Sequence, residues 1–483
     1  MTRLMRLSVI ACVLMALAAT AAFAAGGADL RRVVVFREGT SAQVQQEAIA
    51  QSGSRLLRML ALINGAAIEL PSANTQAAMT SLGAHPAVSG VYDDPRIGAQ
   101  GEAAAIAQGA GGDGAGGDGA GGDGAGGDGA GGDQVVFVTP VPSPAAEIYH
   151  WGVDRIGAPD VHEGSHPSRG EGVKVAVFDT GIDRTHPDLV PSLIGGFNAI
   201  AGADPRAYDD DNGHGTAMAG IIAARRNRAG VIGAAPRALL YAVKVLDKDG
   251  RGHTSDGIYA LEVLAGREDI RIINMSYGTA LVWPLFQVAV RRSYELGKII
   301  VTSRGNGCTP ATATAQGAGG DGAGGDGAGG DGAGGDGAGG DAGCQPYAIK
   351  YPAAYPEVIA VGATTATDKV AGYSLWGGVD VVAPGGDGTL KILTTNRGGG
   401  YGLIIGTSPS AAHVSGAVAL ALERQPKLSF ERVVNVMQRT ADHLGCPAWP
   451  ATSAGCSIDH QGAGLIDVSA MLDALEQSPK TDD

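Results

Sequence analysis

The sequence has few charged residues, few aromatic residues and few cysteines. Of its 483 residues only 17% are charged and 5% are aromatic, and five are cysteines. The formal net charge is −14, but ten copies of the pentapeptide Gly-Ala-Gly-Gly-Asp carry 10 of the 49 acidic residues and leave 39 acids against 35 bases. The rest of the chain is nearly neutral, so we expect no nucleic-acid partner. After the N-terminus no apolar run approaches the about 20 residues of a membrane span, so none is expected.

The first residues have the pattern of an export signal. Arg3 and Arg6 precede an apolar run over 7–19, and Ala22-Phe23-Ala24 fits a small-x-small cleavage site. We expect a signal peptide over residues 1–24 and a secreted or extracellular protein, with the periplasm and the cell surface as alternatives. A membrane anchor is the weaker interpretation because the apolar run is short.

Four cysteines remain after such a signal is removed: Cys308, Cys344, Cys446 and Cys456. An even number in an exported chain favours disulfides, and three connectivities are open. We prefer the local pairs Cys308–Cys344 and Cys446–Cys456. A metal site is less favoured because no Cys-x-x-Cys spacing occurs.

The pentapeptides form two identical cassettes of five tandem copies, the first at 109–133 and the second at 317–341. Such sequence cannot bury a core and is typical of a flexible linker. A calcium-binding array is the alternative, but a period of five with only Ala as apolar residue does not match the nine-residue calcium roll. We therefore expect a small α+β unit over 31–97, a linker over 98–148, a large domain over 149–475 that carries the second cassette, and a polar tail over 476–483.

The large domain alternates short apolar runs with helical segments. Continuous Val/Ile-rich runs stand at 173–178, 239–245, 270–275, 299–303 and 358–362. Buried runs of this kind separated by helices predict an α/β fold with a doubly wound parallel sheet covered by helices on both faces.

Three motifs in this domain carry candidate catalytic residues. Asp179 ends an apolar run, His214 opens a helix rich in small residues, and Ser408 opens another in Gly406-Thr407-Ser408. Each alone has an ordinary structural explanation: a turn residue, a core histidine and a helix N-cap. Together they follow one of the known chain orders of an Asp-His-Ser triad, in which His takes the serine proton and Asp orients His.

With these motifs the chain resembles the subtilisin-like serine proteases. The resemblance covers 149–475 and includes 149–156, 182–189, 230–236 and 273–278. Residues 31–97, with Ile63-Asn64-Gly65, resemble the family's inhibitory propeptide, a small ferredoxin-like unit. The resemblance implies a secreted serine endopeptidase made as a zymogen, acting through an acyl-enzyme.

The resemblance also implies further site residues. Asn306 would donate its side-chain amide to the oxyanion, although Asn-Gly is also a common turn. Substrate would lie as an added strand between two segments, above a pocket floor, formed by Gly250, Arg251, Gly252, Ser276, Tyr277, Gly278, Ser303, Arg304 and Gly305. Arg304 departs from the small residue usual there: it either favours an acidic or polar substrate residue or, as we prefer, points to solvent.

A structural calcium ion is a further implication of the resemblance. Asp188 and Asn227 match the family's stabilising site in position, and oxygen ligands suit calcium. Nearby positive charge on Arg225, Arg226 and Arg228 opposes it, and a solvated loop is the alternative.

For the whole chain we expect a monomer that acts on protein or peptide substrates, is inhibited by its own propeptide and requires no cofactor for its chemistry. Two rival hypotheses are a non-catalytic peptide-binding relative and a repeat-bearing surface or matrix protein.

Overall fold

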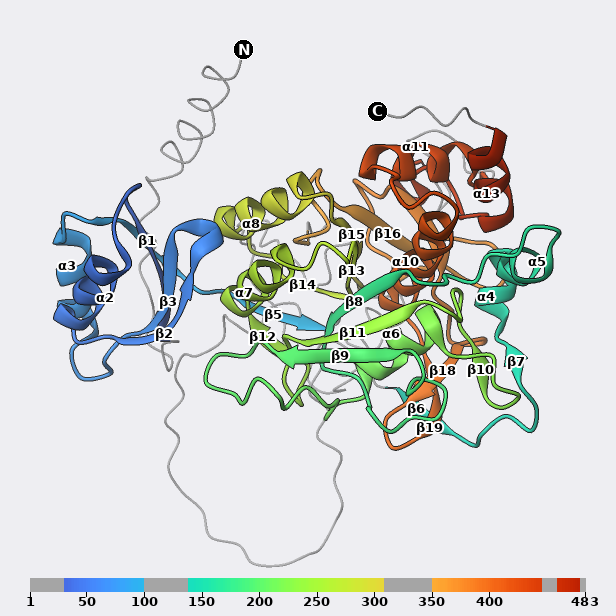
Figure 1. Cartoon of the computed structure of the whole chain (residues 1–483), viewed down its shortest axis with the longest axis horizontal. Helices are drawn as coiled ribbons and strands as arrows, with labels where there is room; N and C mark the ends of the chain where they lie inside the picture. Colours follow the sequence, from blue (N-terminus) through green and yellow to red (C-terminus); the bar gives the residue numbers. More distant parts are fainter. Residues whose placement is uncertain (1–29, 100–137, 308–349, 445–457, 478–483) are drawn as a thin grey trace, which may run out of the picture.

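The computed structural model describes residues 30–99, 138–307, 350–444 and 458–477. Figure 1 shows a small N-terminal unit beside a large domain. The expected signal peptide, both cassettes and the four cysteines of the expected disulfides lie outside the described residues. Helix α13, Val468–Gln477, reaches two residues into the expected polar tail. Within the described residues, no helix combines the length and the apolarity needed to cross a membrane.

The N-terminal unit is an antiparallel four-stranded sheet with two helices, in the order β-α-β-β-α-β of a ferredoxin-like unit. The sheet order is β2-β3-β1-β4. Its elements are β1 Arg31–Phe36, α2 Ala42–Gln51, β2 Arg55–Leu60, the 3₁₀ helix η1 Ala61–Ile63, β3 Gly65–Glu69, α3 Thr75–Ala84 and β4 Val88–Asp93. Two arginines in β2 interrupt its apolar pattern, so its sequence gives little signal for a strand.

The large domain is built on a seven-stranded sheet in which every neighbouring pair is parallel. The strand order is β17-β16-β15-β13-β8-β11-β9. The strands are β8 Lys174–Asp179, β9 Leu193–Asn198, β11 Leu239–Lys244, β13 Ile272–Met275, β15 Ile299–Ser303, β16 Ile359–Thr364 and β17 Val381–Pro384. Successive side chains enter opposite cores: Val175 and Val177 pack on one face, Ala176 and Phe178 on the other.

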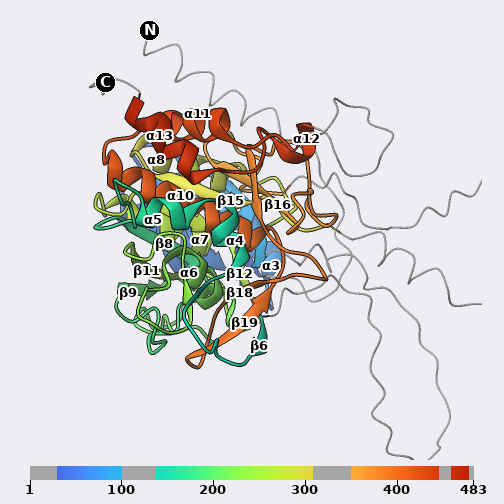
Figure 2. The ribbon, with the colours of Figure 1, turned by 90° about the vertical axis from the view of Figure 1, so that its right-hand side faces the viewer.

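Helices cover both faces, which confirms the expected fold class. One core joins α6 His214–Ala223, α10 Thr407–Arg424, α11 Phe430–Thr440 and α13 to the sheet. The other core joins α7 Thr254–Ala265 and α8 Pro284–Glu295 to the opposite face. Figures 1 and 2 show α7 and α8 on the side of the N-terminal unit and α10, α11 and α13 away from it.

Residues 138–148, expected to be linker, belong to the large domain. Strand β6, Thr139–Val141, pairs with β19, Gly400–Ile404, which pairs with β18, Ile392–Asn396. Strand β7, Ile148–Tyr149, pairs with β10, Val231–Ile232. The short helices α4 Trp151–Arg155, α5 Ala158–Glu163 and α12 Ile458–Gln461 complete the domain.

One strand joins the two bodies. Strand β5, Arg96–Ala99, follows the N-terminal unit and lies between β12, Arg251–His253, and β14, Tyr277–Gly278, of the large domain. The expected boundary at 97/98 therefore falls inside a strand.

Candidate active site

The three motif residues lie where strands end and helices begin. Asp179 is the last residue of β8, an interior strand of the sheet between β13 and β11. His214 is the first residue of α6 and Ser408 the second of α10, and all three side chains are buried. The carboxyl edge of an open parallel sheet is where such folds bring functional groups together.

His214 is held by the carboxylate of Asp179. Its Nδ1 lies 2.8 Å from Oδ1 and 3.0 Å from Oδ2 of Asp179. The N–H of Thr180 donates to the same Oδ1 at 2.8 Å, which fixes the carboxylate. Burial alone would lower the pKa of His214, but the Asp179 carboxylate raises it above its usual value. The imidazole is thus oriented with Nε2 on the other side of the ring, and that Nε2 has no hydrogen-bond partner among the described residues.

A second buried carboxylate, Asp210, holds the turn that presents His214. It accepts hydrogen bonds from the N–H groups of Asn212 and Gly213 and from the hydroxyl of Thr180. It also accepts the N–H and hydroxyl of Thr216, in the first turn of α6. Free N–H groups at a helix start need such an acceptor. Sequence analysis overlooked Asp210, although an acidic run just before a helix is a signal for this role.

Ser408 points toward the expected substrate segment. Its hydroxyl donates to the carbonyl oxygen of Ser276 at 3.3 Å, and the hydroxyl of Ser276 donates to the carbonyl oxygen of Ser408 at 3.3 Å. The amide of Asn274 donates to the Ser276 hydroxyl at 3.0 Å, and Ser415 holds the other end of that amide. The nucleophile candidate is therefore tied to the strand edge beside which a substrate would lie.

Asn306 is oriented by the start of α10. Its side-chain oxygen accepts the N–H and the hydroxyl of Thr407 at 2.9 and 3.0 Å. A Cβ at Gly406 would come within 3.1 Å of the side-chain nitrogen of Asn306, so the amide nitrogen lies directly beside Gly406. The hydrogen bonds from Thr407 fix the side-chain oxygen of Asn306, so its N–H₂ group faces the loop that precedes Ser408.

The two expected substrate segments flank β5. Arg251 lies opposite Gly98 and Gly252 opposite Ile97 on one side; Tyr277 lies opposite Ala99 and Gly278 opposite Gly98 on the other. The N–H of Ala99 donates to the carbonyl oxygen of Gly250 at 2.9 Å. A strand of this chain therefore lies between these two segments, in the position expected for a substrate. We call the space between β12 and β14 the groove.

The side chain of Ile97 anchors β5. It is only 2% exposed and packs in the core that contains Tyr277 and Ile258. Sequence analysis did not single it out, because one apolar residue in Arg96-Ile97-Gly98-Ala99 gives little signal.

Arg304 is buried, so the expectation that it points to solvent is wrong. It is 2% exposed and donates to the carbonyl oxygens of Gly377 at 2.8 Å and Trp376 at 3.1 Å. Burial lowers its pKa to about 10. These bonds fasten the 376–377 segment, so they give no support for a preference for acidic substrates. Gly305, the next residue, donates its N–H to the hydroxyl of Thr407 at 3.1 Å.

Asp188 and Asn227 lie side by side, but as hydrogen-bond acceptor and donor. The side-chain nitrogen of Asn227 donates to Oδ1 of Asp188 at 2.9 Å, and the Tyr401 hydroxyl and the Val231 N–H donate to Oδ2 at 2.9 and 3.3 Å. The side-chain oxygen of Asn227 accepts the N–H of Ala229. Calcium needs six to eight oxygens directed at the ion. Here Asn227 turns its side-chain nitrogen toward Asp188 and its oxygen toward the Ala229 N–H, so in this arrangement the two side chains do not direct oxygens at one ion.

A carboxylate side chain fixes the loop that contains Asn227 and Arg228. Glu147, from the segment expected to be linker, accepts the N–H groups of Asn227 and Arg228.

Known proteins match most of the large domain. The model of the subtilase family matches residues 170–464. Subtilisin BL of Lederbergia lenta is 35% identical over 326 residues, which cover 67% of this chain and 99% of that protein. Subtilisin E of Bacillus subtilis is 34% identical over 327 residues, or 67% of this chain and 71% of that protein.

The chain belongs to the subtilase family. It is a serine endopeptidase with the α/β fold of that family.

Proposed function

We propose that Asp179, His214 and Ser408 form the catalytic triad and that the enzyme is made as an exported zymogen. The contact of His214 Nδ1 with Asp179 is the observation that carries the triad. The position of strand β5 in the groove is the observation that supports the zymogen proposal.

In the proposed reaction a substrate takes the position of β5, so that β12 and β14 bind its main chain on both sides. The Ser408 hydroxyl leaves the Ser276 carbonyl and attacks the scissile carbonyl carbon, while Nε2 of His214 takes its proton. Asp179 keeps the imidazole in the tautomer that accepts at Nε2 and stabilises its charged form. His214 then gives the proton to the leaving amine, and an acyl-enzyme remains that water hydrolyses by the same steps.

Two donors would stabilise the tetrahedral oxyanion. The N–H₂ group of Asn306 is oriented by Thr407, and the backbone N–H of Ser408 lies in the first turn of α10, where it has no helical acceptor. Both are fixed before reaction, so little reorganisation is needed when the charge develops.

The N-terminal unit, residues 31–97, would act as an intramolecular inhibitor. Beyond β5, it contacts the start of α7 through Asp94, which accepts the Thr254 hydroxyl at 3.1 Å and the N–H and hydroxyl of Ser255 at 2.9 and 2.6 Å. Arg31 binds Asp256 at 3.2 Å from the same unit. A buried polar contact and an added strand together would keep substrate out of the groove.

The register of β5 predicts the point of self-cleavage. Ala99, the last residue of β5, lies opposite Tyr277, so in an antiparallel pair a substrate residue one position further along would face Ser276. Ser276 is the residue whose carbonyl accepts the Ser408 hydroxyl. We expect the bond between Gln100 and Gly101 to be cut, which would leave the first cassette on the mature enzyme.

The remaining expectations stand as proposals: removal of residues 1–24 on export, the local disulfide pairs, a monomeric enzyme and chemistry without a cofactor.

Hydrolysis of casein by the full chain tests the triad. Ser408→Ala should abolish it, whereas Ser410→Ala, two residues further on the same helix, should leave most of it because the Ser410 hydroxyl donates to the Gly406 carbonyl, one turn back along the chain. Equal activity of the parent and Ser408→Ala would refute the assignment. An inactive parent that still binds a peptide inhibitor would favour a peptide-binding role.

A further inference from the structure

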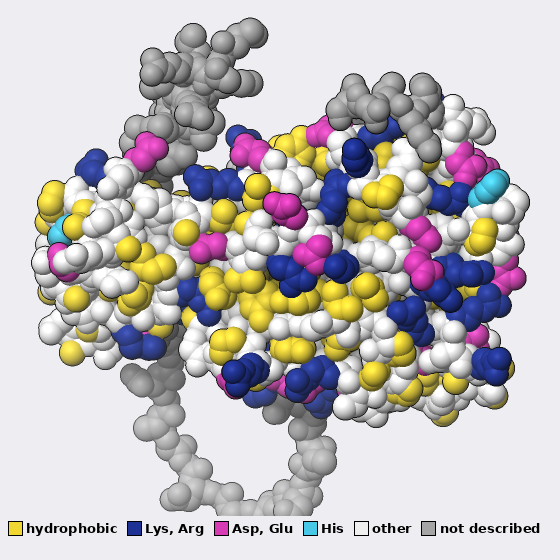
Figure 3. All heavy atoms as spheres, in the orientation of Figure 1, with side chains coloured by type: hydrophobic (Ala, Val, Ile, Leu, Met, Phe, Trp, Pro, Cys, Tyr) yellow, Lys and Arg dark blue, Asp and Glu magenta, His cyan; other side chains and the backbone are white. Residues whose placement is uncertain are grey.

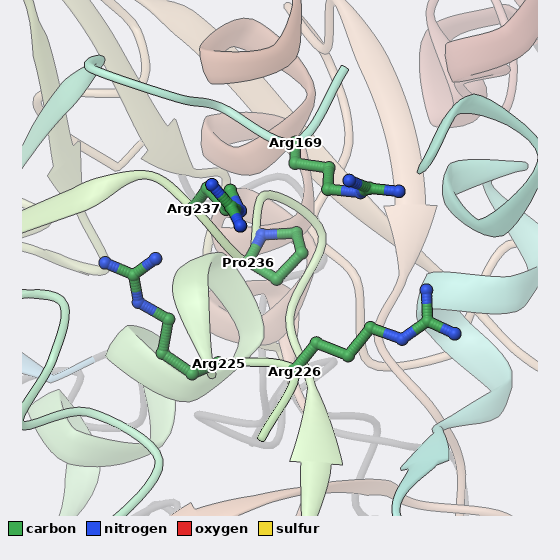
Figure 4. Close-up of a pocket in the computed structure, with 5 residues that line it drawn as sticks. All are labelled: Arg169, Arg225, Arg226, Pro236 and Arg237. Atoms are coloured by element: carbon green, nitrogen blue, oxygen red, sulfur yellow. The ribbon is translucent and has the colours of Figure 1, made fainter. Parts of the chain in front are cut away.

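A group of four arginines lines a cavity at the edge of the sheet opposite the active site. Arg169 precedes β8, Arg237 precedes β11, and Arg225 and Arg226 follow the end of α6; Pro236 completes the lining. The cavity measures about 220 Å³. Figure 4 shows the four side chains around Pro236, with Arg225 on one side and Arg226 on the other. None of these residues takes part in the proposed protease chemistry.

Acidic residues neutralise only part of this charge. Arg226 pairs with Glu163 at 2.5 Å and Arg237 with Glu171 at 2.8 Å. Glu147 lies 4.0 Å from Arg226, but also holds two N–H groups of the neighbouring loop. Figure 3 shows basic and acidic side chains gathered on the right-hand side of the large domain, where α5 lies in Figure 1.

Two of the arginines have no carboxylate among the described residues to pair with their side chains. The guanidinium of Arg169 donates to the carbonyl oxygen of His162, and that of Arg225 donates to the carbonyl oxygen of Pro191. The Nε atoms of Arg169 and Arg225 are buried and have no partner in the described part of the chain. The nearby Glu423 is engaged by the Ser168 hydroxyl and by the N–H groups of Arg169 and Gly170.

Unpartnered buried donors on cations are costly unless an acceptor satisfies them, and an anion also compensates the charge. Burial and then the charge of Arg237 lower the pKa of Arg225, and together they outweigh the opposing effect of the Glu171 carboxylate. Guanidinium groups bind tetrahedral oxyanions well because their planar donors match pairs of oxygens.

We propose that this four-arginine cavity binds a phosphate- or sulfate-type oxyanion and that the bound anion stabilises the folded enzyme. The anion would join three segments that are far apart in sequence: the turn before β8, the loop after α6 and the turn before β11. This site is independent of the proposed protease mechanism.

Such an anion binds the folded chain, because the four arginines come together only there. At a concentration ten times its dissociation constant, the folding equilibrium constant rises about elevenfold. Because the arginines spread around Pro236, tripolyphosphate should act at lower concentration than inorganic phosphate or sulfate.

The test is urea unfolding of the full chain carrying Ser408→Ala, which prevents self-digestion. Inorganic phosphate, sulfate and tripolyphosphate are titrated separately, with sodium chloride keeping the ionic strength constant. In the same background, Arg169→Gln with Arg225→Gln removes the two arginines without carboxylates. The control is Arg228→Gln, which removes one positive charge from the loop that carries Arg225 but none from the cavity lining.

We expect the anions to raise the urea midpoint of the parent and of Arg228→Gln, and to leave the double variant unchanged. Phosphorus NMR line broadening of inorganic phosphate by the folded parent, absent with the double variant, gives a second readout that needs no unfolding. Should the double variant fail to fold, each single variant is compared with Arg228→Gln by the same line broadening. A response no larger than that to chloride, or equal responses in parent and double variant, would overturn the proposal. If the parent responds to tripolyphosphate alone, the oxyanion belongs to an extended polyanion. If the parent responds equally to phosphate, sulfate and tripolyphosphate, the oxyanion is a free ion.

Discussion

Replacing Asp94 by Ala should release the enzyme from its N-terminal unit. The Asp94 side chain is fully buried and receives three hydrogen bonds from Thr254 and Ser255 of the large domain. In Asp94→Ala the N–H of Ser255, at the start of α7, loses its acceptor, and Arg31 loses one of its two carboxylates.

The expected size follows from these contacts. A hydrogen bond to a charged group contributes about 1.5–3 kcal/mol, and Asp94 accepts three from the large domain. Arg31 keeps its contact with Asp256 of the large domain at 3.2 Å, so we take a total loss of about 3 kcal/mol, which corresponds to roughly a hundredfold weaker inhibition.

Dilution of the self-processed complex measures this inhibition. Hydrolysis of a chromogenic peptide is followed over a range of enzyme concentrations, and the concentration at which half of the full activity appears reports the affinity for the cleaved N-terminal unit. We expect this concentration to be roughly a hundredfold higher for Asp94→Ala than for the parent.

Asp93→Ala is the matched control. Asp93 is adjacent, but its side chain is 61% exposed and pairs with Arg32 inside the N-terminal unit. The reasoning fails if Asp94→Ala behaves as the parent does, or if Asp93→Ala weakens inhibition as much.

Three further results are expected. Asn306→Ala should lower kcat about 10²–10³-fold with little change in KM, because it removes an oxyanion donor; an unchanged kcat would exclude that role. Burial lowers the pKa of His413 to about 4, so the folded state keeps this ring neutral and stability should fall by about 3 kcal/mol as the pH drops from 6.5 to 4. Urea unfolding in the Ser408→Ala background should show a smaller loss of stability between pH 6.5 and 4 when His413→Gln is added. An equal loss with and without His413→Gln would show that His413 is not its cause. The thermal midpoint should be the same in calcium and in a chelator, whereas Glu147→Gln should lower it; a rise with calcium would show that the Asp188 loop binds the ion.

The sheet and the catalytic candidates could be predicted from sequence because their signals are local. Continuous apolar runs such as 173–178 predict buried parallel strands, and the motifs around Asp179, His214 and Ser408 are short. The order of these motifs along the chain then suggested one site.

Other features depend on contacts that the sequence does not reveal. Strand β5 has one large apolar residue and exists because β12 and β14, more than 150 residues away, supply its partners. Arg304 is buried because a segment over 70 residues further along offers two carbonyl oxygens. Asp188 and Asn227 suggest a calcium site until the hydroxyl of Tyr401 is seen to donate to the same carboxylate.

The most direct test of the account is the intact mass of the purified parent beside that of Ser408→Ala. The account predicts that the parent separates into two pieces cut between Gln100 and Gly101, while Ser408→Ala stays whole. A parent that remains uncut, a cut in 137–148, or a cut that also occurs in Ser408→Ala would contradict the claim that β5 lies in the groove as the enzyme's own substrate.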